Sequence, residues 1–115
     1  MFKHNHVLVS LFHDKVNQMT IRFDNQVAII TGAARGLGKA YAIEFAKRGA
    51  RVVINDVDFK AAESTAQEIN TTVNHNNVVA VADGHSVATD ANSIVKTAQD
   101  AFGPQIHILI NNAYV

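Results

Sequence analysis

A glycine-rich segment near the start of the chain is the part of the sequence best suited to chemistry. It reads Thr31-Gly32-Ala33-Ala34-Arg35-Gly36-Leu37-Gly38, and it lies between a short apolar run and a segment with helical periodicity. In such a turn Gly32 permits a tight exit from a strand, and Gly36 lets the backbone approach a pyrophosphate. Gly38 lets the helix settle against the sheet, and the helix N-terminus then faces the phosphates. The segment therefore predicts a phosphate site for a nucleotide.

Two other nucleotide-binding patterns do not fit this segment. A P-loop needs four residues before its Gly-Lys-Ser/Thr, whereas five separate Gly32 from Gly38 and Ala40 replaces the hydroxyl residue. The dinucleotide fingerprint G-x-G-x-x-G would need a glycine where Tyr41 stands. The pattern T-G-x-x-x-G-x-G matches at every fixed position. We therefore expect a dinucleotide turn, with glycines that serve only a tight turn as the alternative.

A carboxylate at the end of the next apolar run indicates which dinucleotide is bound. Asp56 lies 18 residues beyond Gly38, near the separation of about 20 at which an acidic residue meets the ribose. It can accept hydrogen bonds from the ribose hydroxyls and would repel the 2′-phosphate of NADP. Arg35 argues the other way, because a guanidinium pairs well with a phosphate. We expect NAD, with NADP less favoured, and we assign Asp58 to the start of the following helix.

The remaining sequence alternates apolar runs with amphipathic segments. Strands are predicted at Val27–Ile30, Val52–Ile54, Val78–Val81 and Ile106–Ile110, and such near-continuous apolar strands are typical of a parallel sheet covered on both faces. Helices are predicted over Leu37–Gly49, after the Asp58 cap, and after Thr89-Asp90 up to Gly103. Their expected inward faces are Gly38, Tyr41, Ala42, Phe45, Ala46 and Gly49, then Phe59, Ala62, Ala66 and Ile69, then Ile94, Ala98, Ala101 and Phe102.

This order of elements predicts an α/β fold. We expect the N-terminal half of a doubly wound Rossmann fold, with four parallel strands in the order 3-2-1-4 and three helices. Residues 1–20 are predicted to form a poorly ordered N-terminal extension. Residues 21–115 are predicted to form a dinucleotide-binding half-domain that is incomplete at its C-terminus. The strand at residues 106–110 would then be an exposed apolar edge, through which we expect self-association.

Composition excludes several classes of function. The chain has ten basic and ten acidic residues, so no net field draws it to nucleic acid. No apolar run approaches the roughly 18 residues of a membrane span, and no signal-peptide cleavage site follows the apolar residues near the start, so we predict neither a membrane protein nor a secreted one. The absence of cysteine removes thiolate chemistry, and no metal site is predicted.

Taken together, these residues resemble the classical short-chain dehydrogenase/reductase family. The resemblance lies in Thr31–Gly38, Asp56 and Asn111-Asn112-Ala113. Within the family, segments such as Phe45–Ala50 and Val95–Gly103 are similar to the branch that holds the 3-hydroxyacyl-CoA dehydrogenase domain of peroxisomal multifunctional enzyme type 2 and its bacterial relatives. The resemblance implies a cytoplasmic or peroxisomal protein.

The resemblance also implies a set of cofactor-binding residues. Asp56 would take the ribose hydroxyls, Ser86 and Val87 would contact adenine, and Asn112 would touch the cofactor ribose from the fourth strand. Tyr114 stands where the family motif has a glycine. The residues implied around the pyrophosphate and the adenosine ribose are Gly32, Arg35, Gly36, Leu37 and Gly38.

The family's catalytic groups find no counterpart in this sequence. The family uses a serine and a Tyr-x-x-x-Lys pair, with the tyrosine as general acid/base, but Tyr41 is followed at that spacing by Phe45. We therefore assign no catalytic residue and expect the chain alone to be inactive. The resemblance implies the NAD(P)-binding part of an oxidoreductase that oxidises a hydroxyl to a carbonyl, with 3-hydroxyacyl-CoA as a candidate substrate. The alternative is a non-catalytic nucleotide-binding module, or a half-domain completed by a partner.

Overall fold

Four strands alternate with three helices in the computed structural model, which describes residues 21–73 and 78–113. The expected N-terminal extension and Tyr114 lie outside the described residues. None of the helices in the described ranges is long and apolar enough to cross a membrane. The elements in chain order are β1 (Val27–Thr31), α2 (Gly36–Lys47), β2 (Arg51–Asn55), α3 (Phe59–Val73), β3 (Ala80–Asp83), α4 (Val87–Phe102) and β4 (Ile108–Ile110).

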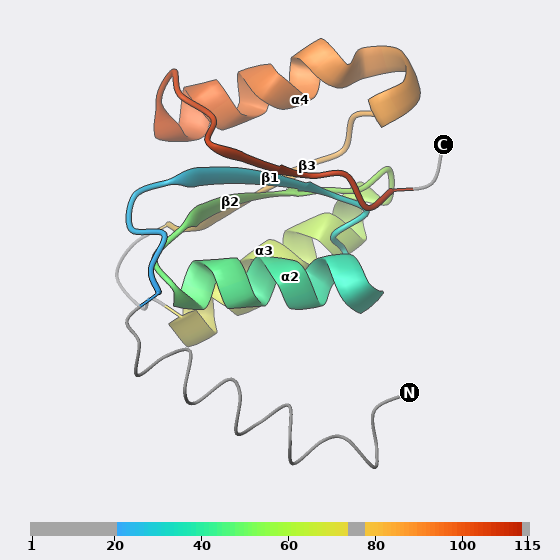
Figure 1. Cartoon of the computed structure of the whole chain (residues 1–115). Helices are drawn as coiled ribbons and strands as arrows, with labels where there is room; N and C mark the ends of the chain where they lie inside the picture. The colour runs from blue at the N-terminus through green and yellow to red at the C-terminus, as the bar shows by residue number, and fades with distance from the viewer. Residues whose placement is uncertain (1–20, 74–77, 114–115) are drawn as a thin grey trace.

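The strands form one parallel sheet in the order β3-β2-β1-β4. Figure 1 shows α2 and α3 on one face of the sheet and α4 on the other. This arrangement confirms the predicted α/β class, the strand order and the number of helices. Because all four strands run the same way, their carboxyl ends lie at one edge of the sheet, where the loops into the helices begin.

The sheet separates two apolar clusters. The larger one joins α2 and α3 to the side chains of Ala28, Ile30, Val52 and Ile54, all of which are fully buried. The smaller one lies beneath α4, where Val27, Ile29 and Val53 meet Ile94 and Ala98. Successive residues of β1 and β2 therefore point to opposite covered faces, which is why these strands are apolar at nearly every position.

Two strands begin later than the sequence pattern predicts. β3 starts at Ala80 instead of Val78, and just before and at this start the side-chain oxygen of Asn70 accepts the backbone N–H groups of Val79 and Ala80. β4 starts at Ile108 instead of Ile106 because the Nδ1 atom of His107 accepts the N–H of Val27, at 2.9 Å. Near both starts a side chain accepts a backbone N–H group.

The helices differ from prediction in a few inward positions. Tyr41, Phe59 and Ala101 are exposed although the helical stripe placed them inside. Helical periodicity, at 100° per residue, predicts which face of a helix points inward. It does not show how far the sheet extends beneath that face. The third helix begins at Val87 and is kinked at Asp90, which has φ −147° and ψ 40°. The predicted start after Asp90 therefore corresponds to the straight part of α4.

The edge strand β4 carries an exposed apolar side chain. Within the described residues β4 pairs with β1 alone, and α4 lies over β1, β2 and β3. Leu109 is opposite Ile29 in register and is 64% exposed. We propose that the polypeptide of 115 residues self-associates along this edge, because unpaired backbone groups and apolar side chains there favour strand pairing.

Leu109→Lys is expected to increase the soluble, monomeric fraction of the 115-residue polypeptide, because a lysine on an edge strand opposes pairing. Ile108→Lys is the matched comparison. Ile108 packs against the larger apolar cluster, so a charge there should lower stability as well. Sedimentation velocity at tens of micromolar checks the prediction. A monodisperse unsubstituted monomer would contradict it.

Candidate dinucleotide-binding site

A cleft of about 550 Å³ lies at the carboxyl ends of the strands. In open α/β sheets this edge is where ligands bind. The cleft is lined by residues at or after the ends of all four strands and in the first turns of α2 and α4, and they are Gly32, Leu37, Asn55, Asp56, Val57, Ser86, Val87, Ala88, Asn112 and Ala113. Six of the nine predicted site residues, Gly32, Leu37, Asp56, Ser86, Val87 and Asn112, are therefore brought together by the fold.

Close packing between β1 and α2 forms the floor of the cleft. Gly38 is buried, and a Cβ atom there would overlap the carbonyl oxygen of Gly32 and lie 2.8 Å from Nδ2 of Asn112. The side chain of Asn112 donates from Nδ2 to the same Gly32 carbonyl at 3.2 Å. Gly38 thus lies beneath the cleft as a packing residue, which explains why it does not line the cavity.

Thr31 anchors the segment that follows β4. Its Oγ1 atom accepts the backbone N–H groups of Asn112 at 2.9 Å and Ala113 at 3.0 Å. The threonine at the start of the glycine pattern therefore fixes the backbone that carries Asn112. Sequence reasoning gave Thr31 no role, although its fixed place in the pattern was a usable signal.

The N-terminus of α2 has no side-chain cap. Arg35 occupies the cap position with extended backbone (φ −155°), makes no capping hydrogen bond, and is followed by a first turn without acidic residues. Gly36 begins the helix on the exposed side with open space beside it. Backbone N–H groups at such a helix end, together with the helix dipole, favour an anion.

Asp56 lies between the glycine loop and the start of α3. Its Oδ2 accepts the N–H of Ala34 at 3.3 Å, and its Oδ1 accepts the N–H of Asp58 at 3.0 Å. A carboxylate has about four lone-pair sites, so acceptor capacity is left for a ligand in the cleft. The expected cap is confirmed at Asp58, whose Oδ1 accepts the N–H of Ala61 at 3.1 Å.

Arg35 is not among the residues that line the cleft, and it pairs with Asp58 at 2.8 Å. This hydrogen bond and the neighbouring charge hold the pKa of Asp58 below its usual value. The guanidinium thus contacts the carboxylate of Asp58, whose own N–H donates to Asp56. Local sequence patterns do not indicate this pair, because its members are 23 residues apart.

A buried polar group joins β2 to the loop after β3. Asn55 is 2% exposed, and its Nδ2 donates to Oδ2 of Asp83 and to the carbonyl of His85, both at 2.9 Å. Asp83 is also buried, and its other oxygen receives the hydroxyl of Thr97 at 2.6 Å. Sequence reasoning missed Asn55, although a polar residue closing an apolar strand was the signal.

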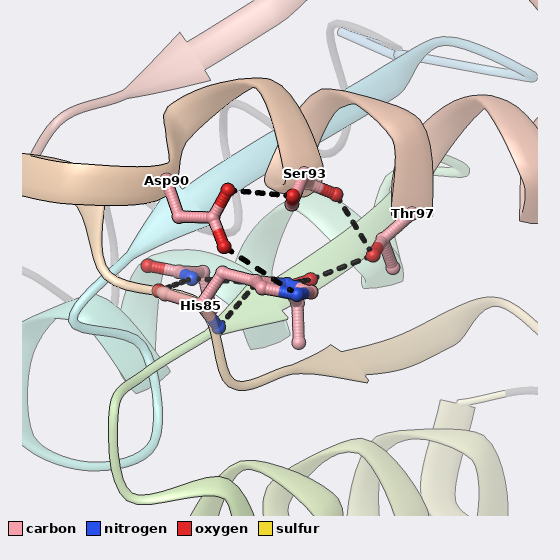
Figure 2. Close-up of polar contacts among 6 residues, drawn as sticks. His85, Asp90, Ser93 and Thr97 are labelled. Carbon is pink, nitrogen blue, oxygen red and sulfur yellow. Dashed lines mark hydrogen bonds and ion pairs between the residues drawn. The ribbon is translucent and has the colours of Figure 1, made fainter.

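His85 completes this network (Figure 2). Its Nδ1 lies 2.8 Å from Oδ1 of Asp83, and its Nε2 lies 3.9 Å from Oδ2 of Asp90, whose other oxygen accepts the Ser93 hydroxyl. Burial raises the pKa of Asp83, but hydrogen bonds from Thr97, His85 and Asn55 outweigh it and the pKa is lowered. The same Asp83 hydrogen bond raises the pKa of His85. The network fixes the segment that leads into Ser86 and Val87 at the cleft.

Gly38→Ala is expected to destabilise the fold by about 1–3 kcal/mol, the usual cost of overpacking. The new methyl group would meet the Gly32 carbonyl and the Asn112 amide, so the helix must move away from β1. Urea denaturation of the substituted and unsubstituted chains measures the effect. Equal midpoints would show that α2 does not depend on this close approach.

The His85–Asp83 pair should make stability depend on pH. Since folding raises the pKa of His85, its stabilising contribution is complete below about pH 6.5, the unfolded value, and is lost as pH rises through the folded pKa. We expect His85→Gln to cost more stability at pH 5.5 than at pH 8.5. Thr97→Val serves as the control, because it removes a neutral donor to Asp83. A pH-independent His85→Gln effect, measured by urea denaturation, would contradict this account.

The Asp83 carboxylate also makes the stability of the fold depend on pH, but in a more acidic range. Since the pKa of Asp83 is lowered in the fold, its contribution is present above the unfolded value of about 4 and is lost as pH falls through the folded pKa. The window from pH 5.5 to 8.5 therefore isolates His85.

Comparison with known proteins gives the site a family context. Residues 26–115 match the short chain dehydrogenase family. The chain is 45% identical over 104 residues to peroxisomal multifunctional enzyme A of Dictyostelium discoideum, covering 83% of this chain and 22% of that protein. It is 48% identical over 90 residues to the (2S)-[(R)-hydroxy(phenyl)methyl]succinyl-CoA dehydrogenase subunit BbsD of Thauera aromatica, covering 77% of this chain and 35% of that one.

A solved structure shows the same arrangement of elements. The 7α-hydroxysteroid dehydrogenase complexed with NADH and 7-oxo glycochenodeoxycholic acid superposes with a TM-score of 0.73 and 33% identity, over 84% of this chain and 36% of that one. The chain thus spans between about a fifth and about a third of the length of these three proteins. The family match covers most of the sequence, and the chain belongs to the short-chain dehydrogenase/reductase family.

Proposed function

We propose that this chain binds the adenosine diphosphate part of a nicotinamide dinucleotide, NAD in preference to NADP, within an oxidoreductase. The observation that carries the proposal is one cleft that is lined both by Leu37, in the uncapped first turn of α2, and by Asp56. NADH is the nucleotide in the 7α-hydroxysteroid dehydrogenase complex. A bound nicotinamide would supply hydride transfer, and the residues of this chain bind and orient the other end of the molecule.

The phosphate end of the cleft suits a pyrophosphate. Gly32 has φ +61° and turns the chain directly from β1 into the loop. Gly36 leaves the approach to the first turn of α2 open. We assign Gly32, Gly36 and Leu37 to backbone contact with the phosphates, and Gly38 to holding α2 in place beneath them.

The part of the cleft that we assign to ribose and adenine suits a ribose that carries two uncharged hydroxyl groups. Asp56 presents a carboxylate that accepts hydrogen bonds from hydroxyls and repels a 2′-phosphate. Ser86 and Val87 line the same cavity from the start of α4, so we assign them to the adenine ring. Asn112, whose backbone N–H donates to Oγ1 of Thr31, is assigned to the ribose nearer the nicotinamide.

The reaction proposed for the whole protein is the oxidation of a hydroxyl group to a carbonyl. The name of the succinyl-CoA dehydrogenase subunit, together with the family resemblance of the sequence, leads us to propose an acyl-CoA derivative as substrate, such as 3-hydroxyacyl-CoA. The name of the Dictyostelium relative supports a peroxisomal location, with the cytoplasm as the alternative. No residue of this chain is assigned a catalytic role, and the 115-residue polypeptide is proposed to bind without turnover.

Asp56→Ala is expected to weaken NAD binding about tenfold, the usual cost of losing a charged hydrogen-bond acceptor. NADP binding should fall less, because the same change removes a repulsive charge. Isothermal titration calorimetry with both nucleotides measures the two losses. Asp100→Ala is the control, since this exposed α4 carboxylate pairs with Lys96 and does not line the cleft. Equal losses for NAD and NADP would contradict the role proposed for Asp56.

A further inference from the structure

An ion pair and a neighbouring carboxylate lie where the glycine loop approaches the start of α3. Arg35 and Asp58 form an ion pair at 2.8 Å, and both side chains are largely exposed. Asp56 contacts the backbone of both neighbouring segments, through the N–H groups of Ala34 and Asp58. Its charge also acts on Arg35 and raises the pKa of the guanidinium, together with the larger effect of Asp58.

We propose that Asp58 is a specificity-determining residue, which disfavours 2′-phosphorylated dinucleotides by holding Arg35 in an ion pair beside the ribose site. The inference rests on the proposed dinucleotide-binding function. It differs from the role of Asp56, because Asp58 does not line the cleft and acts by engaging the cation that a 2′-phosphate would need.

The two oxygens of Asp58 have different partners, and this fixes the carboxylate in space. Oδ1 accepts the N–H of Ala61 at 3.1 Å as the cap of α3, while Oδ2 accepts from Arg35 at 2.8 Å. The cap ties Asp58 to the first turn of a 15-residue helix. Arg35 is therefore drawn toward α3 by a carboxylate that is itself held in position.

The guanidinium is otherwise well suited to bind a phosphate. Arginine presents a planar fork of donors that matches phosphate oxygens in a bidentate arrangement. Arg35 immediately follows Ala34, whose N–H contacts Asp56, so it is next to the carboxylate assigned to the ribose hydroxyls. With Asp58 in place, a 2′-phosphate meets two carboxylates and a cation that is already neutralised. Without the Asp58 charge, it meets one carboxylate and a free cation.

The expected size of the effect follows from the exposure of the pair. Exposed ion pairs contribute little in water, so separating this one should change an equilibrium by about fivefold at most. Removing the repulsion between Asp58 and the phosphate acts in the same direction. We therefore expect Asp58 to shift the ratio of NADP to NAD affinity by about fivefold at low ionic strength.

Asp58→Asn separates the charge from the cap. Asparagine caps helices about as well as aspartate, so α3 should remain intact, which the thermal midpoint by circular dichroism checks. Calorimetry with NAD and NADP then gives the affinity ratio. We expect NADP binding to tighten about fivefold and NAD binding to stay unchanged. Glu68→Gln is the matched control, because Glu68 lies on the same helix and pairs with Lys39 at 2.9 Å, outside the cleft.

Arg35→Gln tests whether Asp58 acts through the arginine. In an Arg35→Gln background, Asp58→Asn should change the affinity ratio much less than it does alone. An unchanged ratio in Asp58→Asn would overturn the proposal, and so would an equal change with and without Arg35, since that would leave only general charge repulsion.

The failure of the proposed function has a different signature. A folded chain that binds neither NAD nor NADP would overturn the dinucleotide site itself, and the role of Asp58 with it. A chain that binds NAD normally while Asp58→Asn leaves the ratio unchanged would overturn the role of Asp58 alone.

Discussion

The contact between Gly32 and Gly38 is the constraint on which the candidate site depends. The carbonyl of Gly32 lies so close to Gly38 that a Cβ atom has no room there. This close approach lets α2 begin immediately beside the end of β1. It also leaves the Gly32 carbonyl within 3.2 Å of the Asn112 amide. One missing side chain thus brings the glycine loop, a helix N-terminus and the end of β4 to the same place.

The opposite wall of the cleft is held by polar groups instead of by close backbone packing. A buried carboxylate is costly unless hydrogen bonds replace its water. Asp83 meets this condition with donors from Asn55, Thr97 and both the backbone and side chain of His85. These donors come from β2, from α4 and from the loop between β3 and α4. The network therefore fixes the loop that leads into Ser86 and the start of α4 relative to the end of β2, next to Asp56.

Local patterns predicted most of the fold, and distant contacts account for what they missed. The number, type and order of the elements followed from apolar runs and helical stripes, because a strand that is buried on both faces is apolar at nearly every position. The late starts of β3 and β4 could not be predicted from such patterns. Near these starts the side chains of Asn70 and His107 accept backbone N–H groups from segments that become adjacent only after folding.

The same distinction applies to the site. Gly32, Gly38 and Asp56 were predictable because a strand, a tight turn and a helix dictate their spacing along the chain. The contacts of Asn55, Thr31 and Arg35 were not predictable, because each joins residues that are 23 or more positions apart. For Asn55 and Thr31 the sequence offers only a position, at the end of an apolar strand and at the start of the glycine pattern. A formal charge in the sequence also gives no indication of whether a partner will neutralise it. Arg35 was weighed as a free cation, and the structure shows that it is paired.

The pairing of charges around the cleft determines what field a ligand would meet. Asp83 is surrounded by donors and Asp58 is paired with Arg35, so both are largely compensated. In the described part of the chain, Asp56 receives hydrogen bonds from backbone N–H groups alone, and its negative charge acts on the cavity. The N-terminus of α2 places positive partial charge at the other end of the same cleft. A dinucleotide has anionic phosphates next to neutral ribose hydroxyls. Because the two ends of the cleft carry opposite charge, they favour the orientation with the phosphates at the α2 N-terminus and the ribose hydroxyls at Asp56.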